Sequence, residues 1–196
     1  MRDVGSIVDG PDLQITTSAH AMSDHSSTVD DVDCLGTLYG AEEPVYAGSG
    51  WTAVRDQVIR EPRSDNRHWV EQTAVLFGSA ARASGFFTAS RAVWKTCANT
   101  SVTTTEGSYS ARVWKLANVG ELGRTGRVVG EVGEAGGAGE AMITQDSEQQ
   151  DANGWACQHA MGVVANLVSE AFACGYSVSD EAQRIVARIL TKAADR

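Results

Sequence analysis

The sequence lacks the features by which most membrane-spanning, metal-binding and hydrolytic proteins are recognised. It has no run of the roughly 18 to 20 apolar residues that a membrane helix needs, and its first residues are not the apolar core of a signal peptide. No pair of cysteines has C-x-x-C or another metal-type spacing, and the G-x-S-x-G motif of a nucleophilic serine is missing. We therefore expect no catalytic residue, no bound metal and no cofactor.

Positive charge is also scarce. The 196 residues include 16 Lys and Arg against 25 Asp and Glu, which gives a formal net charge of −9. Nucleic acids and anionic membrane surfaces carry charge of the same sign, so neither is an expected partner. A hydrophobic content of 42% in a chain of this length predicts a single domain with a substantial core.

The chain contains four cysteines, Cys34, Cys97, Cys157 and Cys174. An even number without metal-type spacing fits structural disulfides better than four unpaired buried thiols, and disulfides persist in oxidising compartments. This places the chain outside the cytosol. Because no export signal is visible, we expect that a signal sequence or membrane anchor belongs to the full-length protein.

The spacing of the last two cysteines predicts a chain reversal if they are bridged. On one continuous helix Cys157 and Cys174 would lie about 25 Å apart, whereas a disulfide allows a Cα separation of roughly 4.4 to 6.8 Å. With residues 165–166 as a two-residue turn, Cys157 faces Cys174 directly. We predict that residues 155–175 form a long hairpin closed by a disulfide.

The other elements follow from periodicity and turn residues. An apolar element is expected at 4–15, followed by a polar connection at 16–33. Helices are predicted at 51–61 and 79–97 and after the capping residues 179–181, and strands at 67–77, 101–106, 110–117, 126–132 and 140–145. Residues 133–139 indicate a glycine-rich hairpin loop rather than a phosphate-binding loop, because no Lys-Ser/Thr follows them. The pattern predicts an α+β domain, an antiparallel sheet with helices packed on one face.

Aromatic residues and the hairpin suggest where a ligand could bind. Trp51 and Trp94 lie on predicted apolar helix faces and are expected in the core. One face of the hairpin carries small residues, while the other is mixed, with Met161 and Phe172 among its members. If helices cover the small face, the mixed face is either exposed or forms a ligand cleft. The candidate cleft residues are Trp69, Glu71, Trp114, Trp155, His159 and Glu170.

Four sequence runs carry a resemblance to a known family. They are PVYAGSGWTAVR at 44–55, HWVEQ at 68–72, FFTAS at 86–90 and GWACQ at 154–158. With the four cysteine positions, they resemble the PknH-like extracellular domain family, the sensor domains of mycobacterial serine/threonine kinases and related secreted lipoproteins. The resemblance runs from about Cys34 to Ala194, whereas residues 1–33 match weakly. Residues 34–196 are therefore expected to be the sensor-like domain, preceded by an N-terminal element and polar connection.

The resemblance implies the disulfide pairs Cys34–Cys97 and Cys157–Cys174, and a single α+β domain with a cleft for an unidentified ligand. It also implies a non-enzymatic sensor of the mycobacterial cell envelope, anchored to the outer face of the plasma membrane as a lipoprotein or receptor ectodomain. The expected ligand is a small molecule, glycan or lipid of the envelope. The alternative is an interaction module that docks to another envelope protein.

Overall fold

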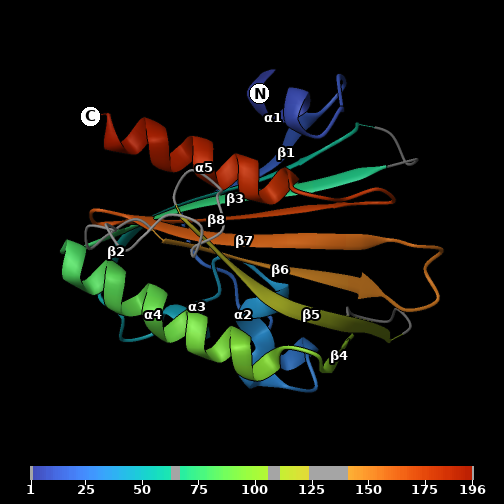
Figure 1. Cartoon of the computed structure of the whole chain (residues 1–196), viewed down its shortest axis with the longest axis horizontal. Coiled ribbons are helices and arrows are strands. Elements are labelled where there is room, and N and C mark those ends of the chain that lie inside the picture. The colour runs from blue at the N-terminus through green and yellow to red at the C-terminus, as the bar shows by residue number, and fades with distance from the viewer. Residues whose placement is uncertain (1, 63–66, 106–110, 124–140, 196) are drawn as a thin grey trace.

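The computed structural model describes residues 2–62, 67–105, 111–123 and 141–195. Within these residues, eight strands form one antiparallel sheet in the order β1-β2-β3-β8-β7-β6-β5-β4 (Figure 1). The strands are β1 (Gln14–Ala19), β2 (Trp51–Arg60), β3 (His68–Phe77), β4 (Ser101–Thr104), β5 (Arg112–Gly123), β6 (Ala141–Gln149), β7 (Ala156–Val164) and β8 (Leu167–Gly175). The expected α+β class and the single antiparallel sheet are confirmed.

The β7–β8 hairpin at the centre of this sheet confirms the predicted chain reversal. Val164 pairs with Leu167 across the turn, and Cys157 pairs with Cys174. These two cysteines form a disulfide with a Cα separation of 4.0 Å. The residue that takes the left-handed backbone in the turn is Ala165, with φ of 47°, and not Asn166. The Asn166 side chain instead donates a hydrogen bond to the Phe77 carbonyl, which joins the turn to β3.

Five α-helices occur among the described residues: α1 (Arg2–Ile7), α2 (Leu35–Leu38), α3 (Glu43–Tyr46), α4 (Ala80–Cys97) and α5 (Glu181–Ala194). The two long helices lie where the sequence predicts them. The hydroxyl of Ser79 accepts a hydrogen bond from the Arg82 amide and caps the start of α4. Two short 3-10 turns, η1 (Ser26–Thr28) and η2 (Val32–Cys34), precede α2.

The long helices cover opposite faces of the sheet, which corrects the expectation of helices on one face (Figure 1). Ala160 of β7 packs in the core under α5, whereas its neighbour Met161 packs in the core under α4. Successive side chains of a strand point to opposite faces, so the two helices must lie on different sides. Because both faces of the sheet are covered at its centre, almost every residue of β7 and β8 is buried.

The small face of the hairpin allows α5 to approach closely. A Cβ atom added to Gly162 would lie 2.6 Å from Leu190 Cδ1 and 2.9 Å from Val186 Cγ1. Real Cβ atoms do not approach other atoms this closely, so a larger residue would push the helix away. A helix therefore covers the small face, which is the condition under which the sequence left the mixed face to form a cleft.

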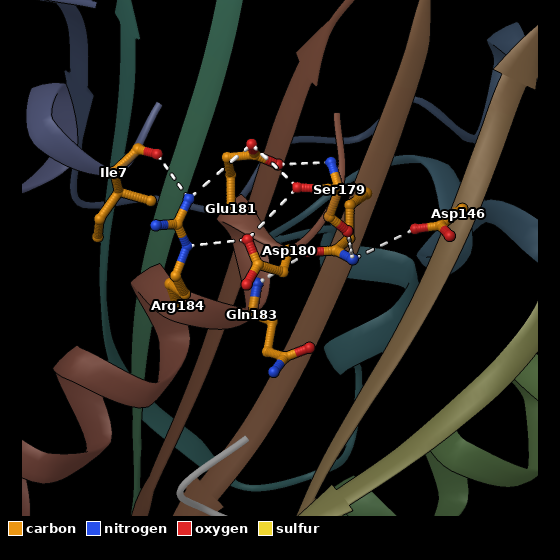
Figure 2. Close-up of polar contacts among 8 residues, drawn as sticks. Ile7, Asp146, Ser179, Asp180, Glu181, Gln183 and Arg184 are labelled. Carbon is orange, nitrogen blue, oxygen red and sulfur yellow. Dashed lines mark hydrogen bonds and ion pairs between the residues drawn. The ribbon is translucent and has the colours of Figure 1, made fainter. Parts of the chain in front are cut away.

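A side chain of β7 forms hydrogen bonds with backbone groups at the start of α5, and Figure 2 shows the polar contacts of this region. Gln158 of β7 accepts a hydrogen bond from the Gln183 amide at 3.1 Å, and its own amide donates to the Ser179 carbonyl at 2.6 Å. Arg184 pairs with Asp180 and donates to the Ile7 carbonyl at the end of α1. These contacts tie α1 and α5 to the same face of the sheet.

Residues 51–60 form strand β2, although the apolar spacing of residues 51–61 predicts a helix. The strand is rich in the β-branched residues that suit a sheet, and it pairs along its length with β1 and β3. A register shift between Trp51 and Ala53 breaks the strict alternation that would have indicated a strand. The tertiary pairing therefore overrides a weak local pattern.

Two further boundaries differ from the sequence-based expectation. Strand β5 continues to Gly123, beyond its expected end at residue 117, and β1 includes residues assigned to the polar connection. The predicted strand at 126–132 and the glycine-rich loop at 133–139 lie outside the described residues.

The second disulfide joins Cys34 of η2 to Cys97, the last residue of α4, with a Cα separation of 5.7 Å. Both cysteines are buried, and they pack with Val102 and Leu116 in a small core of their own. This bridge fastens the segment between β1 and β2, residues 20–50, onto the α4 side of the sheet. The two disulfides and their pairing are thus confirmed.

Replacing Cys34 and Cys97 together by Ala should lower the free energy of unfolding by about 4 kcal/mol, because the bridge closes a long loop. The matched change at Cys157 and Cys174, which close a shorter loop, should cost about 3 kcal/mol. Urea unfolding of the three proteins measures both. A loss of less than about 1 kcal/mol in either double variant would contradict this role.

Candidate ligand cavity

A cavity of about 570 Å³ lies on the α4 side of the sheet, beyond the part that α4 covers. Its floor is formed by residues from all eight strands, and its roof by Ser23, His25, residues 38–40 and Glu42. Gly40 lets the roof approach the floor, because a Cβ atom there would lie 3.1 Å from Glu71 Oε1. The size is within the range of about 300 to 1,000 Å³ typical of small-molecule sites.

Four of the six candidate cleft residues, Trp69, Glu71, Trp114 and Trp155, line this cavity. The three tryptophans pack around one buried group, the side chain of Phe172 and the Cys157–Cys174 disulfide. Trp69 meets Phe172 edge to face, with ring centroids 6.2 Å apart. The middle of the floor is therefore apolar and aromatic.

The other two candidates, His159 and Glu170, do not line the cavity. The His159 ring lies between Trp94 of α4 and Phe172 of β8, with centroid distances of 4.2 and 3.7 Å. Each of the two candidates is only 2% exposed. The mixed face of the hairpin is thus divided: its inner part is buried beneath the roof segment and α4, and its outer part, at Phe172, faces the cavity.

His159 and Glu170 form a buried hydrogen-bonded chain with Tyr46. His159 Nδ1 lies 3.3 Å from the Thr37 carbonyl, which can only accept, so this nitrogen carries a hydrogen. His159 Nε2 lies 3.1 Å from Glu170 Oε2, and the Tyr46 hydroxyl donates to Glu170 Oε1 at 2.5 Å. One proton between Nε2 and Oε2 leaves the pair with no net charge, whichever atom holds it.

Burial is the main cause of the pKa shifts of His159 and Tyr46. It lowers the pKa of His159 against the opposing effect of Glu170, and it raises the pKa of Tyr46 well above its ordinary value, with Glu170 adding to the increase. Tyr46 therefore remains a hydrogen-bond donor throughout the physiological range. These hydrogen bonds join α3, through Tyr46, and α2, through Thr37, to the middle of the sheet.

Tyr46→Phe should lower the free energy of unfolding by about 1 to 3 kcal/mol, because Glu170 loses its donor in a buried site. The matched control is Tyr176→Phe, since Tyr176 is 59% exposed and a change there should stay within about 0.5 kcal/mol. Chemical denaturation of both variants makes the comparison. Equal stability of the two would show that the Tyr46 hydroxyl contributes nothing.

Three carboxyl groups gather at the end of the cavity formed by β2 and β3. Asp56 and Glu71 come from these strands, and Glu42 comes from the roof. Asp56 accepts a hydrogen bond from Thr73 at 2.7 Å, and Glu42 accepts from the His25 amide at 2.7 Å and contacts the His25 ring at 2.5 Å. Both Glu42 and Glu71 are at least nine-tenths buried.

Sequence reasoning identified Glu71 but missed Asp56 and Glu42. Asp56 was assigned to a predicted helix, which would not pair with the strand that carries Glu71. Read as a strand, the alternation Val54, Asp56, Val58 and Arg60 places all four on the face that holds the cavity. Glu42 has no comparable signal, because its position depends on the path of the roof segment.

Glu71 is the most perturbed of these carboxyls. Burial raises its pKa well above the ordinary value, and the neighbouring Asp56, with which it shares a hydrogen bond, raises it further, as do Glu170 and Glu42. A hydrogen bond between two carboxyl groups needs a proton on one of them. The raised pKa assigns this proton to Glu71, with Asp56 as the acceptor.

Glu71→Gln should raise the melting temperature at neutral pH. A raised pKa in the folded state means that folding favours the protonated carboxyl, so this contribution is complete below the unfolded pKa of about 4.3 and is lost as the pH rises towards the folded pKa. The Gln amide donates to Asp56 without needing a proton. The stability gain should therefore grow from pH 4 to pH 7 in thermal unfolding, whereas exposed Glu43→Gln should show no such trend. A gain that is independent of pH would contradict this assignment.

Within the described part of the chain, no group of three or more His, Cys, Asp or Glu residues is arranged to hold a metal ion. The helices of that part also include none that is long and apolar enough to span a membrane.

Comparison with known proteins agrees with this architecture. A family model described as the PknH-like extracellular domain matches residues 2–192. The serine/threonine-protein kinases PknH of Mycobacterium bovis and Mycobacterium tuberculosis H37Rv are each 34% identical over 190 residues, 97% of this chain. The chain spans only 29% and 28% of their respective lengths.

A solved structure matches over the whole chain. The crystal structure of the extracellular domain of PknH from Mycobacterium tuberculosis superposes with a TM-score of 0.85 at 32% identity, covering 100% of this chain and 91% of that one. The similarity therefore lies in the part of those kinases outside the membrane, and it includes the region of the cavity.

Proposed function

Since the chain belongs to the PknH-like extracellular domain family, which places it outside the cytoplasm, we propose that it is a non-enzymatic sensor domain that binds a small envelope molecule, glycan or lipid in the cavity. The observation that carries this proposal is the cavity itself: about 570 Å³, with an aromatic floor and a few buried polar groups at one end. In this proposal, the full-length protein holds the domain at the outer face of the mycobacterial plasma membrane, either as a lipoprotein or as a receptor ectodomain.

Binding without chemical turnover fits the way the acidic and basic groups are held. His159 and Glu170 are paired with each other beneath the roof, away from the cavity. Asp56 and Glu42, which line it, accept hydrogen bonds from Thr73 and His25. These partners orient the carboxyl groups for recognition.

The position of the cavity suits a domain tethered to a surface. Helices α1 and α5 lie on the opposite face of the sheet from α4, as Figure 1 shows. A connection that approaches through either of them leaves the cavity on the α4 side open. Occupancy can then change while the domain remains tethered.

A thermal-shift screen with fractionated envelope extracts tests this function. A ligand present at about 100 times its Kd should stabilise the native state by about 2.7 kcal/mol, a rise of roughly 5 to 10 °C for a domain of this size. The double variant Trp114→Ala/Trp155→Ala should lose most of the shift, because both side chains line the cavity. Trp51→Ala is the matched control, since Trp51 packs against the core under α4 and does not line the cavity.

If no fraction raises the melting temperature, the cavity does not serve small ligands. Crosslinking of a specific envelope protein to the domain in the same extracts would then support the alternative, a protein-interaction module. A shift that survives in Trp114→Ala/Trp155→Ala would place the ligand elsewhere on the domain.

A further inference from the structure

The two ends of the cavity differ in charge. At the β2–β3 end, Asp56, Glu71 and Glu42 all line the cavity, and they are close enough for Asp56 and Glu42 to perturb Glu71. Arg112 belongs to β5, whose backbone is separated from that of β3 by three intervening strands, or about 19 Å at the usual strand spacing. Arg60 pairs with Trp69 in the β2–β3 ladder and so lies diagonally opposite Glu71, but the charged groups that shift the pKa of Glu71 are all carboxyls. The acidic end therefore keeps its negative potential within the cavity.

Among the cavity-lining residues described, the basic group closest to these carboxyls is His25. Its ring contacts Glu42 at 2.5 Å and stacks on Tyr39, with centroids 4.5 Å apart. When protonated, its single positive charge faces Glu42 together with the Asp56–Glu71 pair, whose two carboxyl groups share one proton. Negative charge is thus in excess even when His25 is protonated.

Aromatic rings border the same end. Trp69 lies two residues before Glu71 on β3, so both side chains point into the cavity. Phe172 pairs with Glu71 across the β3–β8 ladder, and the Tyr39 ring approaches from the roof. Carboxylates together with the faces of Trp and Tyr rings are the groups that recognise ammonium ions, through direct charge attraction and cation–π contact.

The structure assigns to this end of the cavity the ammonium group of an organic cation, a primary amine or quaternary ammonium ion, whose apolar part lies along Phe172 and the Cys157–Cys174 disulfide towards Trp114 and Trp155. This inference rests on the proposed function, since it names the chemical class of ligand for the same cavity. An anionic ligand is repelled by Asp56 and Glu42. A neutral ligand gains the aromatic contacts but does not offset the repulsion between the neighbouring carboxyl groups.

The test uses three small molecules of the same shape and different charge: choline, its neutral isostere 3,3-dimethyl-1-butanol, and the anion 3,3-dimethylbutanoate. Each is titrated into protein with ¹⁵N-labelled tryptophan, and the indole signals of Trp69 and the other four tryptophans are followed. Choline should shift the Trp69 signal in a saturable manner and bind about tenfold or more tightly than the neutral isostere. The anion should not bind.

The double variant Asp56→Asn/Glu71→Gln removes the charge of the pair and keeps its shape. It should reduce the preference for choline over the neutral isostere to about threefold or less, with Glu43→Gln as a control that leaves it unchanged. A thermal unfolding curve verifies that the double variant is folded, and Asp56→Asn alone should show a smaller loss in the same direction.

Three outcomes would overturn the inference: equal binding of choline and its isostere, tighter binding of the anion, or no response of Trp69 to any of the three. The proposed function is judged separately, by the envelope screen. A neutral or anionic envelope ligand that depends on Trp114 and Trp155 would leave that function standing while this inference fails.

Discussion

The register of the β7–β8 hairpin is the constraint on which the other parts of the domain depend. These two strands lie at the centre of the sheet and are covered on both faces, so each side chain must suit one particular neighbour. Gly162 admits α5 on one side, while His159 and Glu170 pair on the other. A slip of one residue would exchange the faces and would bury the carboxyl group against the apolar helix. The Cys157–Cys174 bridge joins the strands near their open ends and excludes such a slip.

The cavity lies under residues 20–50, the segment that supplies its roof, because this segment is attached to the sheet and to α4 at separate points and does not pack along the whole sheet. Cys34 is bonded to the end of α4, Thr37 contacts the buried His159, and Glu42 is bound by His25. Between these attachments and the floor, Trp69, Phe172 and Glu71 line the cavity. Burying the Glu71 carboxyl beside other carboxyls is unfavourable for folding. Strongly perturbed carboxyls of this kind concentrate at functional sites, which agrees with the place of Glu71 in a cavity.

Family membership and the cavity describe different aspects of the molecule. The match to the extracellular domain of PknH covers the whole chain and fixes its architecture and its location outside the cytoplasm. The relatives are more than three times as long, so their kinase activity belongs to parts that this chain does not match. Family membership does not identify the ligand, whereas the residues that line the cavity indicate its chemistry. A floor of rings and a disulfide, ending at three carboxyl groups, gives the cavity a direction along which an amphiphilic molecule can be oriented.

The sequence by itself determined the features that depend on neighbours along the chain. The hairpin followed from the spacing of two cysteines around a two-residue turn, α5 from an apolar stripe, and the strand that carries Trp69 and Glu71 from the β-rich run at 67–77. Residues 51–61 were assigned wrongly, because the bulge near Trp51 hides the strand pattern and only pairing with β1 and β3 stabilises it. The placement of helices on both faces, the burial of His159 and Glu170, and the meeting of Asp56 and Glu42 with Glu71 were decided by tertiary structure. Each of these depends on which distant segments pack together, and the free energy of such packing is not contained in any local pattern.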